Sequence, residues 1–164
     1  MNWTIHNVYG LLHVVTASIA VLCACIILFS KKGTVFHKRV GYTYVICILI
    51  LKISSVGVME FFKGKPGPFH MGAIVSLIFT TLGIIPVMRK KGKNYLQRHY
   101  VYISGSLIGL FAAFFVEAVF RSFHSALLII VSTIGISAIV AIVGGILIRK
   151  FRSHFFKEDG SYKW

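Results

Sequence analysis

Five long apolar stretches dominate this sequence and restrict what it can fold into. They cover residues 8–29, 40–62, 70–88, 101–120 and 126–148. A helix of roughly 17–25 apolar residues crosses the hydrocarbon core of a bilayer. The stretches lack the alternation of polar and apolar residues that a lipid-facing β-barrel requires. We therefore predict an all-α integral membrane protein with five transmembrane helices, of which the first four form a bundle.

The composition supports a single polytopic membrane domain over residues 1–164. Hydrophobic residues make up 57% of the chain and charged residues 13%, against about 25% charged residues in soluble domains. So little polar surface could not cover so many apolar side chains in water. A soluble enzyme, a nucleic-acid-binding domain and a disordered chain are therefore excluded.

Basic residues between the apolar stretches predict the orientation of the chain. The formal net charge is +14, and 14 of the 18 Lys and Arg residues fall in segments 30–39, 89–98 and 149–164. The alternate connections hold three, and Lys52 lies within the second stretch. Cytoplasmic loops carry such an excess. We expect an outer N-terminus, a cytoplasmic C-terminus and a tail over 149–164 that lies along anionic lipid headgroups. The N-terminus lacks the basic region of a signal peptide.

Ionisable residues within the apolar stretches need a reason, because each costs at least about 2.5–3.5 kcal/mol on insertion scales. A rise of 1.5 Å per residue gives the depth of each along its helix. By this measure four polar residues share one layer, roughly 22–27 Å above the cytoplasmic ends of their helices. The layer comprises His13, Lys52, His70 and Glu117, with Glu60 and His124 slightly further out.

Two imidazoles and a carboxylate are typical ligands of a catalytic zinc ion, which keeps a further position for water. The layer supplies these groups from His13, His70 and Glu117, and other divalent transition metals would accept the same donors. Two other interpretations remain open. The layer is either a structural polar cluster, in which Glu117 (or Glu60) neutralises Lys52, or a pocket for a quinone or another ligand.

A second histidine pair lies towards the cytoplasmic side. His37 opens the second apolar helix and His99 opens the fourth, whereas His13 and His70 belong to the first and third. Opposed pairs at two levels of a four-helix bundle would suit bis-histidine ligation of b-type heme. The neighbouring Lys38 argues instead for interfacial histidines that bond loop carbonyls or lipid phosphate, as do Arg39 and Arg98.

Two segments resemble a known family. The stretch HKRVGYTYV resembles the His-Arg-x-x-Gly-x-x-Tyr element of the bacterial membrane proteins called domain of unknown function 2306. The stretch QRHYVYISGSLIGLFAAFFVEAVFR resembles the second element of this family. The resemblance covers residues 10–121, with the fifth helix as an addition, and implies a bacterial cytoplasmic membrane location. The motif positions are His37, Gly41, Tyr44, His99, Ser104 and Arg121.

The sequence departs from the family pattern in two places. Lys38 precedes Arg39, and residues 100–102 read Tyr-Val-Tyr where the family favours Trp-Met. The family name carries no activity. The resemblance therefore supports the architecture and leaves the chemistry open.

Small residues at four-residue spacing mark surfaces where helices approach closely. Gly105 and Gly109 lie in the fourth stretch, and Ser137, Ala141 and Gly145 lie in the fifth. In lipid, such spacing allows helix backbones to pack at short range. This pattern concerns packing and indicates no chemistry.

Three functions follow from the sequence. The first is a divalent metal centre, most plausibly zinc, for metal-assisted hydrolysis or metal handling. The second is a redox or quinone-linked protein with heme b on His37 and His99. The third is a non-catalytic assembly factor with a structural polar cluster. The sequence does not decide whether the protein is an enzyme.

Overall fold

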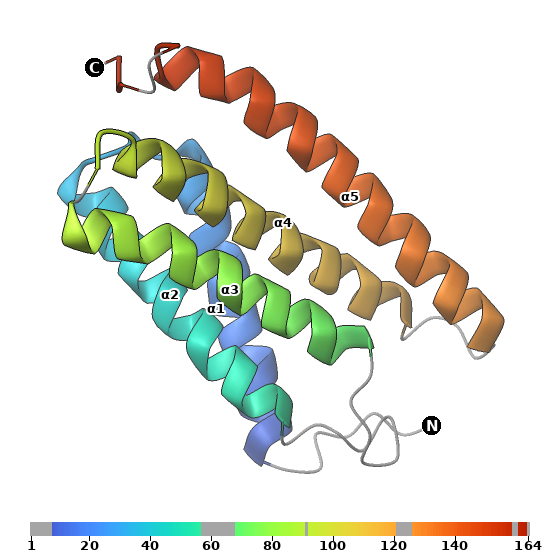
Figure 1. Cartoon of the computed structure of the whole chain (residues 1–164). Coiled ribbons are helices and arrows are strands. Elements are labelled where there is room, and N and C mark those ends of the chain that lie inside the picture. The colour runs from blue at the N-terminus through green and yellow to red at the C-terminus, as the bar shows by residue number, and fades with distance from the viewer. Residues whose placement is uncertain (1–7, 57–67, 91, 121–125, 159–160, 164) are drawn as a thin grey trace. The chain divides into compact units, whose positions relative to one another are not determined.

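The computed structural model describes residues 8–56, 68–90, 92–120, 126–158 and 161–163 (Figure 1). The described chain is helical, as predicted, and its one extended pairing is an isolated bridge between Phe156 and Tyr162. The helices are α1 (Val8–Phe29), α2 (Val35–Val56), α3 (Pro68–Arg89), α4 (Tyr95–Phe120) and α5 (Ala126–Phe155).

Four helices are long and apolar enough to cross a membrane. Their candidate spans are Val8–Phe29, Gly72–Arg89, Tyr95–Val119 and Ile130–Phe155. Among the described residues α2 does not join them, and part of its expected span, 57–62, lies outside the description. Multiple spans are therefore confirmed, whereas the fifth span and the orientation stay predictions.

Several helices extend beyond the predicted stretches, and α2 begins at Val35 where residue 40 was expected. The fourth was expected to begin at residue 101 but α4 begins at Tyr95, and the fifth was expected to end at 148 but α5 continues to Phe155. Both extensions contain basic residues, and Lys and Arg are good helix formers. A helix therefore continues past the apolar residues that cross the hydrocarbon, and the tail expected over 149–164 is helical in its first part.

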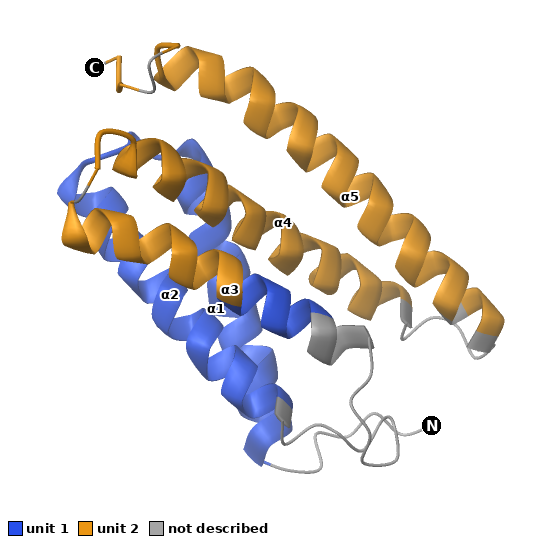
Figure 2. Cartoon of the chain, in the orientation of Figure 1, with its two compact units in different colours: residues 1–77 blue, residues 78–164 orange. Residues whose placement is uncertain are grey.

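The chain divides into two compact units, residues 1–77 and 78–164, and each is described by itself (Figure 2). In the first unit α1 packs against α2. The buried residues of α1 include the small Ala20 and Ala24, and those of α2 include the large Tyr44 and Ile48. Small residues on one helix let the other approach closely in lipid. The contact therefore needs no polar residue along most of its length.

The side chain of Lys32 caps the C-terminal end of α1. The Lys32 ammonium donates to the carbonyl of Leu28 at 3.0 Å and also to that of Ile27. The last carbonyls of a helix lack donors within the helix, and the negative end of the helix dipole attracts cations. Burial lowers the pKa of Lys32 from its ordinary value.

In the second unit α4 packs against α5 and against the second half of α3. A methyl group added at Gly83 of α3 would lie 2.8 Å from the Ile103 side chain of α4. One added at Gly144 of α5 would lie 2.5 Å from Ile108. An alanine at either position would therefore force the neighbouring isoleucine to shift. The small-residue spacing pointed to Gly145, but that position has no neighbour within 4 Å, so the close approach is one residue away.

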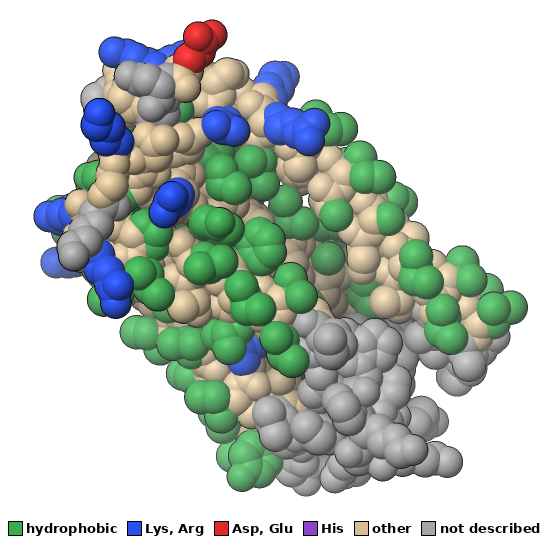
Figure 3. Space-filling model, in the orientation of Figure 1, with side chains coloured by type: hydrophobic (Ala, Val, Ile, Leu, Met, Phe, Trp, Pro, Cys, Tyr) green, Lys and Arg blue, Asp and Glu red, His purple; other side chains and the backbone are tan. Residues whose placement is uncertain are grey.

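The outer surface of α5 is apolar. No residue from 130 to 155 is buried, and exposed side chains such as Ile134 and Ile142 continue along the helix. Figure 3 shows hydrophobic side chains along α5 and basic ones near its C-terminal end. An exposed apolar helix of this length is typical of a surface that faces lipid.

Candidate functional site

His99 is held in one orientation by a bond between two helices. It lies one turn into α4, is half-buried, and its Nδ1 is 2.8 Å from the carbonyl oxygen of Gly83 in α3. A carbonyl oxygen can only accept, so Nδ1 carries the proton and Nε2 keeps its lone pair. Histidines that bind metals have this arrangement, because the bonded nitrogen fixes the tautomer and the other nitrogen ligates.

The local sequence of α3 explains why a backbone carbonyl is within reach of His99. Pro86 lies inside α3, and proline has no N–H to donate to the carbonyl four residues earlier, that of Leu82. His99 bonds the adjacent carbonyl, on a residue with no side chain to cover it. Neighbouring helices often supply donors where proline interrupts a membrane helix. Gly83 therefore lets α4 approach the backbone of α3 closely enough for His99 to reach it.

A second polar link joins the same two helices. The hydroxyls of Thr80 and Ser106 are 2.6 Å apart, and both residues are at most 1% exposed. The family resemblance indicated Ser104 instead, which is only half-buried. Two spacings could have revealed the pair: Thr80 lies three residues before Gly83, and Ser106 lies seven after His99. Residues so spaced share one face of a helix.

His13 has a different partner. Its Nδ1 is 3.3 Å from the hydroxyl oxygen of Ser54 in α2, within the first unit. The same hydroxyl donates to the carbonyl of Leu51 at 3.0 Å. When it does so, Nδ1 is the donor to Ser54, as in the His99 arrangement. A hydroxyl can also rotate and donate to the ring, so this contact does not fix the tautomer of His13.

The structure does not place the three predicted metal ligands relative to one another. His13 is half-buried in α1 and Glu117 is half-buried in α4, and these helices belong to different units. The side chain of His70 lies outside the description, as do Glu60, Arg121 and His124. Among the residues that were described, no group of three or more His, Cys, Asp or Glu could hold a metal ion. The predicted zinc centre is therefore unsupported so far and stays a prediction.

Two further predicted residues lie in α2. His37 is half-buried in the first turn, where its backbone N–H donates to the Thr34 hydroxyl at 3.1 Å, so Thr34 caps the helix. Lys52 is half-buried near the other end. Because Lys52 belongs to the first unit and Glu117 to the second, their pairing also stays a prediction.

Helices of this kind and number define a multi-pass α-helical membrane protein. The chain belongs to the family described as predicted membrane protein (DUF2306), whose sequence pattern matches residues 10–152. This match includes most of α5, so the expectation that the fifth helix is an addition to the family was wrong. No curated protein and no solved structure matches the chain.

Proposed function

We propose that the protein is a membrane redox protein in which His99 and His37 would hold a b-type heme. The observation that carries the proposal is the bond from Nδ1 of His99 to the Gly83 carbonyl. It leaves Nε2 as the nitrogen that can ligate iron. Heme iron takes only its axial ligands from the protein, so the proposal does not need three donors in one cluster.

The position of His99 favours ligation over an interfacial role. The sequence alone allowed His99 to bond loop carbonyls or lipid phosphate, because basic residues flank it. It bonds instead a carbonyl within α3 and is half-buried. His37 is the second ligand that the sequence offers: it lies near the N-terminal end of α2 in the first unit, as His99 lies near that of α4 in the second. The sequence predicts that these two ends share one membrane face.

An absorption spectrum and an elemental analysis of the purified full-length protein test the proposal. We expect a Soret band, and iron at about one equivalent per chain if each chain holds one heme. A colourless protein with a stoichiometric divalent metal would favour a zinc site in the outer layer, by which we mean the predicted layer of His13, Lys52, His70 and Glu117. A protein with neither would contradict both and favour a structural role for the polar residues.

The outer layer supports a second candidate function, a divalent metal centre with His13, His70 and Glu117 as ligands. The observation in its favour is the contact between His13 and Ser54, because metal-ligating histidines are oriented through their second nitrogen. Such a centre would polarise a substrate or activate water. Replacing Ser54 by Ala should weaken zinc affinity about 10-fold or more. Unchanged zinc affinity, measured by titration of the apo-protein, would argue against His13 as a ligand.

A further inference from the structure

The end of the chain folds back onto the last turn of α5. We call residues 156–163 the C-terminal hook, of which 159–160 lie outside the description. Within it, the Lys157 N–H donates to the Ser161 carbonyl at 2.9 Å, and Phe156 and Tyr162 form the isolated bridge. The Lys163 N–H donates to the carbonyl of Phe155 at 3.0 Å. These bonds give the end of the chain a defined position beside the helix.

Aromatic contacts hold the hook against α4 within the second unit. Phe156 is 6% exposed, and its ring centroid lies 5.6 Å from those of Tyr100 and Tyr162. The Tyr100 hydroxyl also donates to the Ile148 carbonyl of α5 at 3.2 Å. Arg152 adds a polar contact, because Gln97, with its amide oxygen turned towards the guanidinium, accepts from Nε at 2.6 Å. The hook is thus packed on two helices.

Lys163 places a positive charge beside the last turn of α5. Its ammonium donates to the Ser153 carbonyl at 2.5 Å, while its backbone N–H donates to the Phe155 carbonyl. Carbonyls in the last turn lack helical donors and carry the negative end of the helix dipole. An ammonium has three donors, so this bond leaves two to bind a further acceptor. Lys163 therefore lies beside the basic residues of α5 and not at the end of a loose tail.

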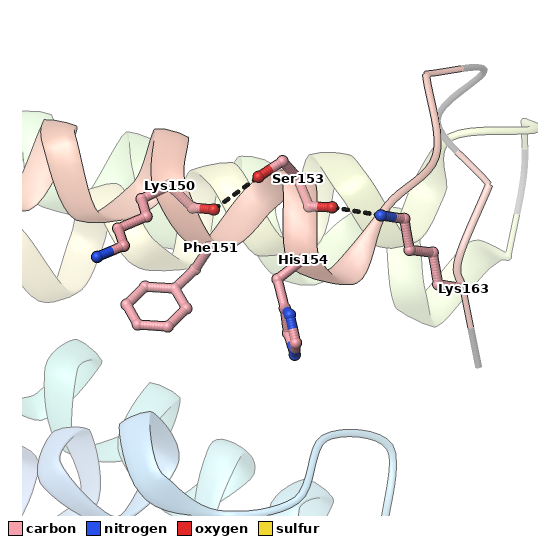
Figure 4. Close-up of a pocket in the computed structure, with 5 residues that line it drawn as sticks. All are labelled: Lys150, Phe151, Ser153, His154 and Lys163. Carbon is pink, nitrogen blue, oxygen red and sulfur yellow. Dashed lines mark hydrogen bonds between the residues drawn. The ribbon is translucent and has the colours of Figure 1, made fainter.

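Lys163 borders a surface hollow of about 460 Å³ at this place. Figure 4 shows its lining side chains, with Phe151 and His154 on the same side of the helix and Lys163 bonded to Ser153. The lining includes two lysines, a histidine and a phenylalanine, and in Figure 4 the Lys150 and Lys163 side chains lie at its two ends. The lining residues are Lys150, Phe151, Ser153, His154 and Lys163.

The position of the hollow along α5 indicates the kind of ligand that it would bind. Exposed apolar side chains continue along the helix to Leu147, and beyond it basic residues flank the exposed Phe151. The hollow therefore lies where an apolar lipid-facing surface gives way to charge, which is the level of the headgroups. Phe151, 47% exposed, can contact acyl chains from there, while the two ammonium groups are suited to phosphate. The acidic Glu158 belongs to the hook but does not line the hollow.

We propose that the C-terminal hook and the last turns of α5 form a binding site for the phosphate of an anionic phospholipid headgroup. Lys150 and Lys163 bind the phosphate, and Phe151 contacts the lipid at the border of the acyl region. The site differs from a general basic tail because the hook fixes Lys163 in place. It is independent of the heme proposal, since it uses none of the histidines assigned there.

Lipid titration of the full-length protein tests the site. The protein in neutral detergent is titrated with dioleoylphosphatidylglycerol, and bound lipid is counted by native mass spectrometry. Lys163→Gln and Lys150→Gln should each weaken binding about 10-fold, as expected for a lost hydrogen bond to a charged group. Lys157→Gln is the matched control, because Lys157 lies in the same hook but does not line the hollow. This control should lose less than about twofold, and Lys163→Arg should retain most of the binding.

Three outcomes would overturn the proposal. An equal loss in the Lys157→Gln control would mean that only the summed surface charge attracts lipid. Equal binding of dioleoylphosphatidylcholine would remove the need for an anionic lipid. Displacement of the lipid by inorganic phosphate at the same concentration would identify a free-phosphate site. Because heme content is measured on the same samples, a failed heme proposal would remain distinguishable from a failed lipid site.

Discussion

His13 and His99 have different kinds of hydrogen-bond partner, and one of these histidines lies in each compact unit of the chain. In the second unit, Nδ1 of His99 bonds a backbone carbonyl of α3 at 2.8 Å. In the first unit, Nδ1 of His13 contacts the Ser54 hydroxyl at 3.3 Å. A carbonyl accepts only, whereas a hydroxyl can donate or accept. The His99 imidazole therefore has a defined tautomer, whereas that of His13 depends on a rotatable group.

This comparison indicates which imidazole is held in one orientation by the backbone. The position of a backbone acceptor is fixed by its helix, so the bond of His99 is disturbed only by changes in packing. A side-chain acceptor can be deleted without moving either helix. The substitutions below use this contrast, and their expected effects decrease from one to the next.

The largest effect is expected from His99→Ala. If His99 ligates heme, this variant should lose nearly all heme, because no other ring nitrogen replaces it. Heme per chain is measured by the pyridine hemochrome spectrum. Tyr95→Ala, a truncation one turn earlier on the same helix, should keep heme near the wild-type value. Retention of heme in His99→Ala would exclude His99 as an essential ligand.

Replacing Gly83 by Ala should disturb the α3–α4 contact on which His99 depends. The new methyl group would lie 2.8 Å from Ile103, and overpacking of this kind costs about 1–3 kcal/mol. We expect a lower Tm and partial loss of heme. Gly72→Ala is the control on the same helix, because its added methyl group has no neighbour within 4 Å. Equal melting temperatures of the two variants would contradict the close approach at Gly83.

A smaller effect is expected from Thr80→Val, which removes one hydroxyl of the buried pair with Ser106. Hydrogen bonds between membrane helices contribute about 0.6 kcal/mol on average and up to about 1.7 kcal/mol. A double-mutant cycle with Ser106→Ala should yield a coupling energy in this range. Thr43→Val serves as control, because the exposed Thr43 hydroxyl bonds the Arg39 carbonyl of its own helix at 3.1 Å. Zero coupling would show that the two hydroxyls do not stabilise each other.

The smallest effect on stability is expected from Ser54→Ala. Loss of a contact as long as 3.3 Å should cost no more than about 0.6 kcal/mol, and the heme held by His99 should remain. Thermal unfolding and the heme spectrum of the same sample measure both quantities. Loss of heme in this variant would assign a heme ligand to the outer layer. It would then be His13, and not His99, whose hydrogen bond prepares a ligand.

The fold followed from hydrophobicity where the helix and the apolar stretch coincide. The range 8–29 was predicted for the first helix and is the range of α1. The prediction was wrong where a helix continues into basic residues, as at the end of α5. Hydropathy measures partition into lipid, whereas helix length is set by backbone hydrogen bonds, to which Lys and Arg offer no obstacle. The return of the hook onto α5 was not predicted either, because it depends on contacts with Tyr100.

The candidate site was predictable only in part. His99 was selected because it is a histidine at the start of an apolar helix, and its role as a ligand stays a prediction. Its partner Gly83 was not found, since any carbonyl of α3 could have accepted the bond. The choice depends on the rotation and register of α3 against α4, which side-chain packing decides. Ser106 was missed for the same reason.

Low-temperature electron paramagnetic resonance of the oxidised full-length protein tests the central claim most directly. Ligation by the imidazoles of His99 and His37 predicts a low-spin ferric signal in the wild type. The signal should disappear in His99→Ala and also in His37→Ala, and it should persist in His13→Ala. A wild-type protein without this signal, or a signal that survives the loss of His99, would contradict the account.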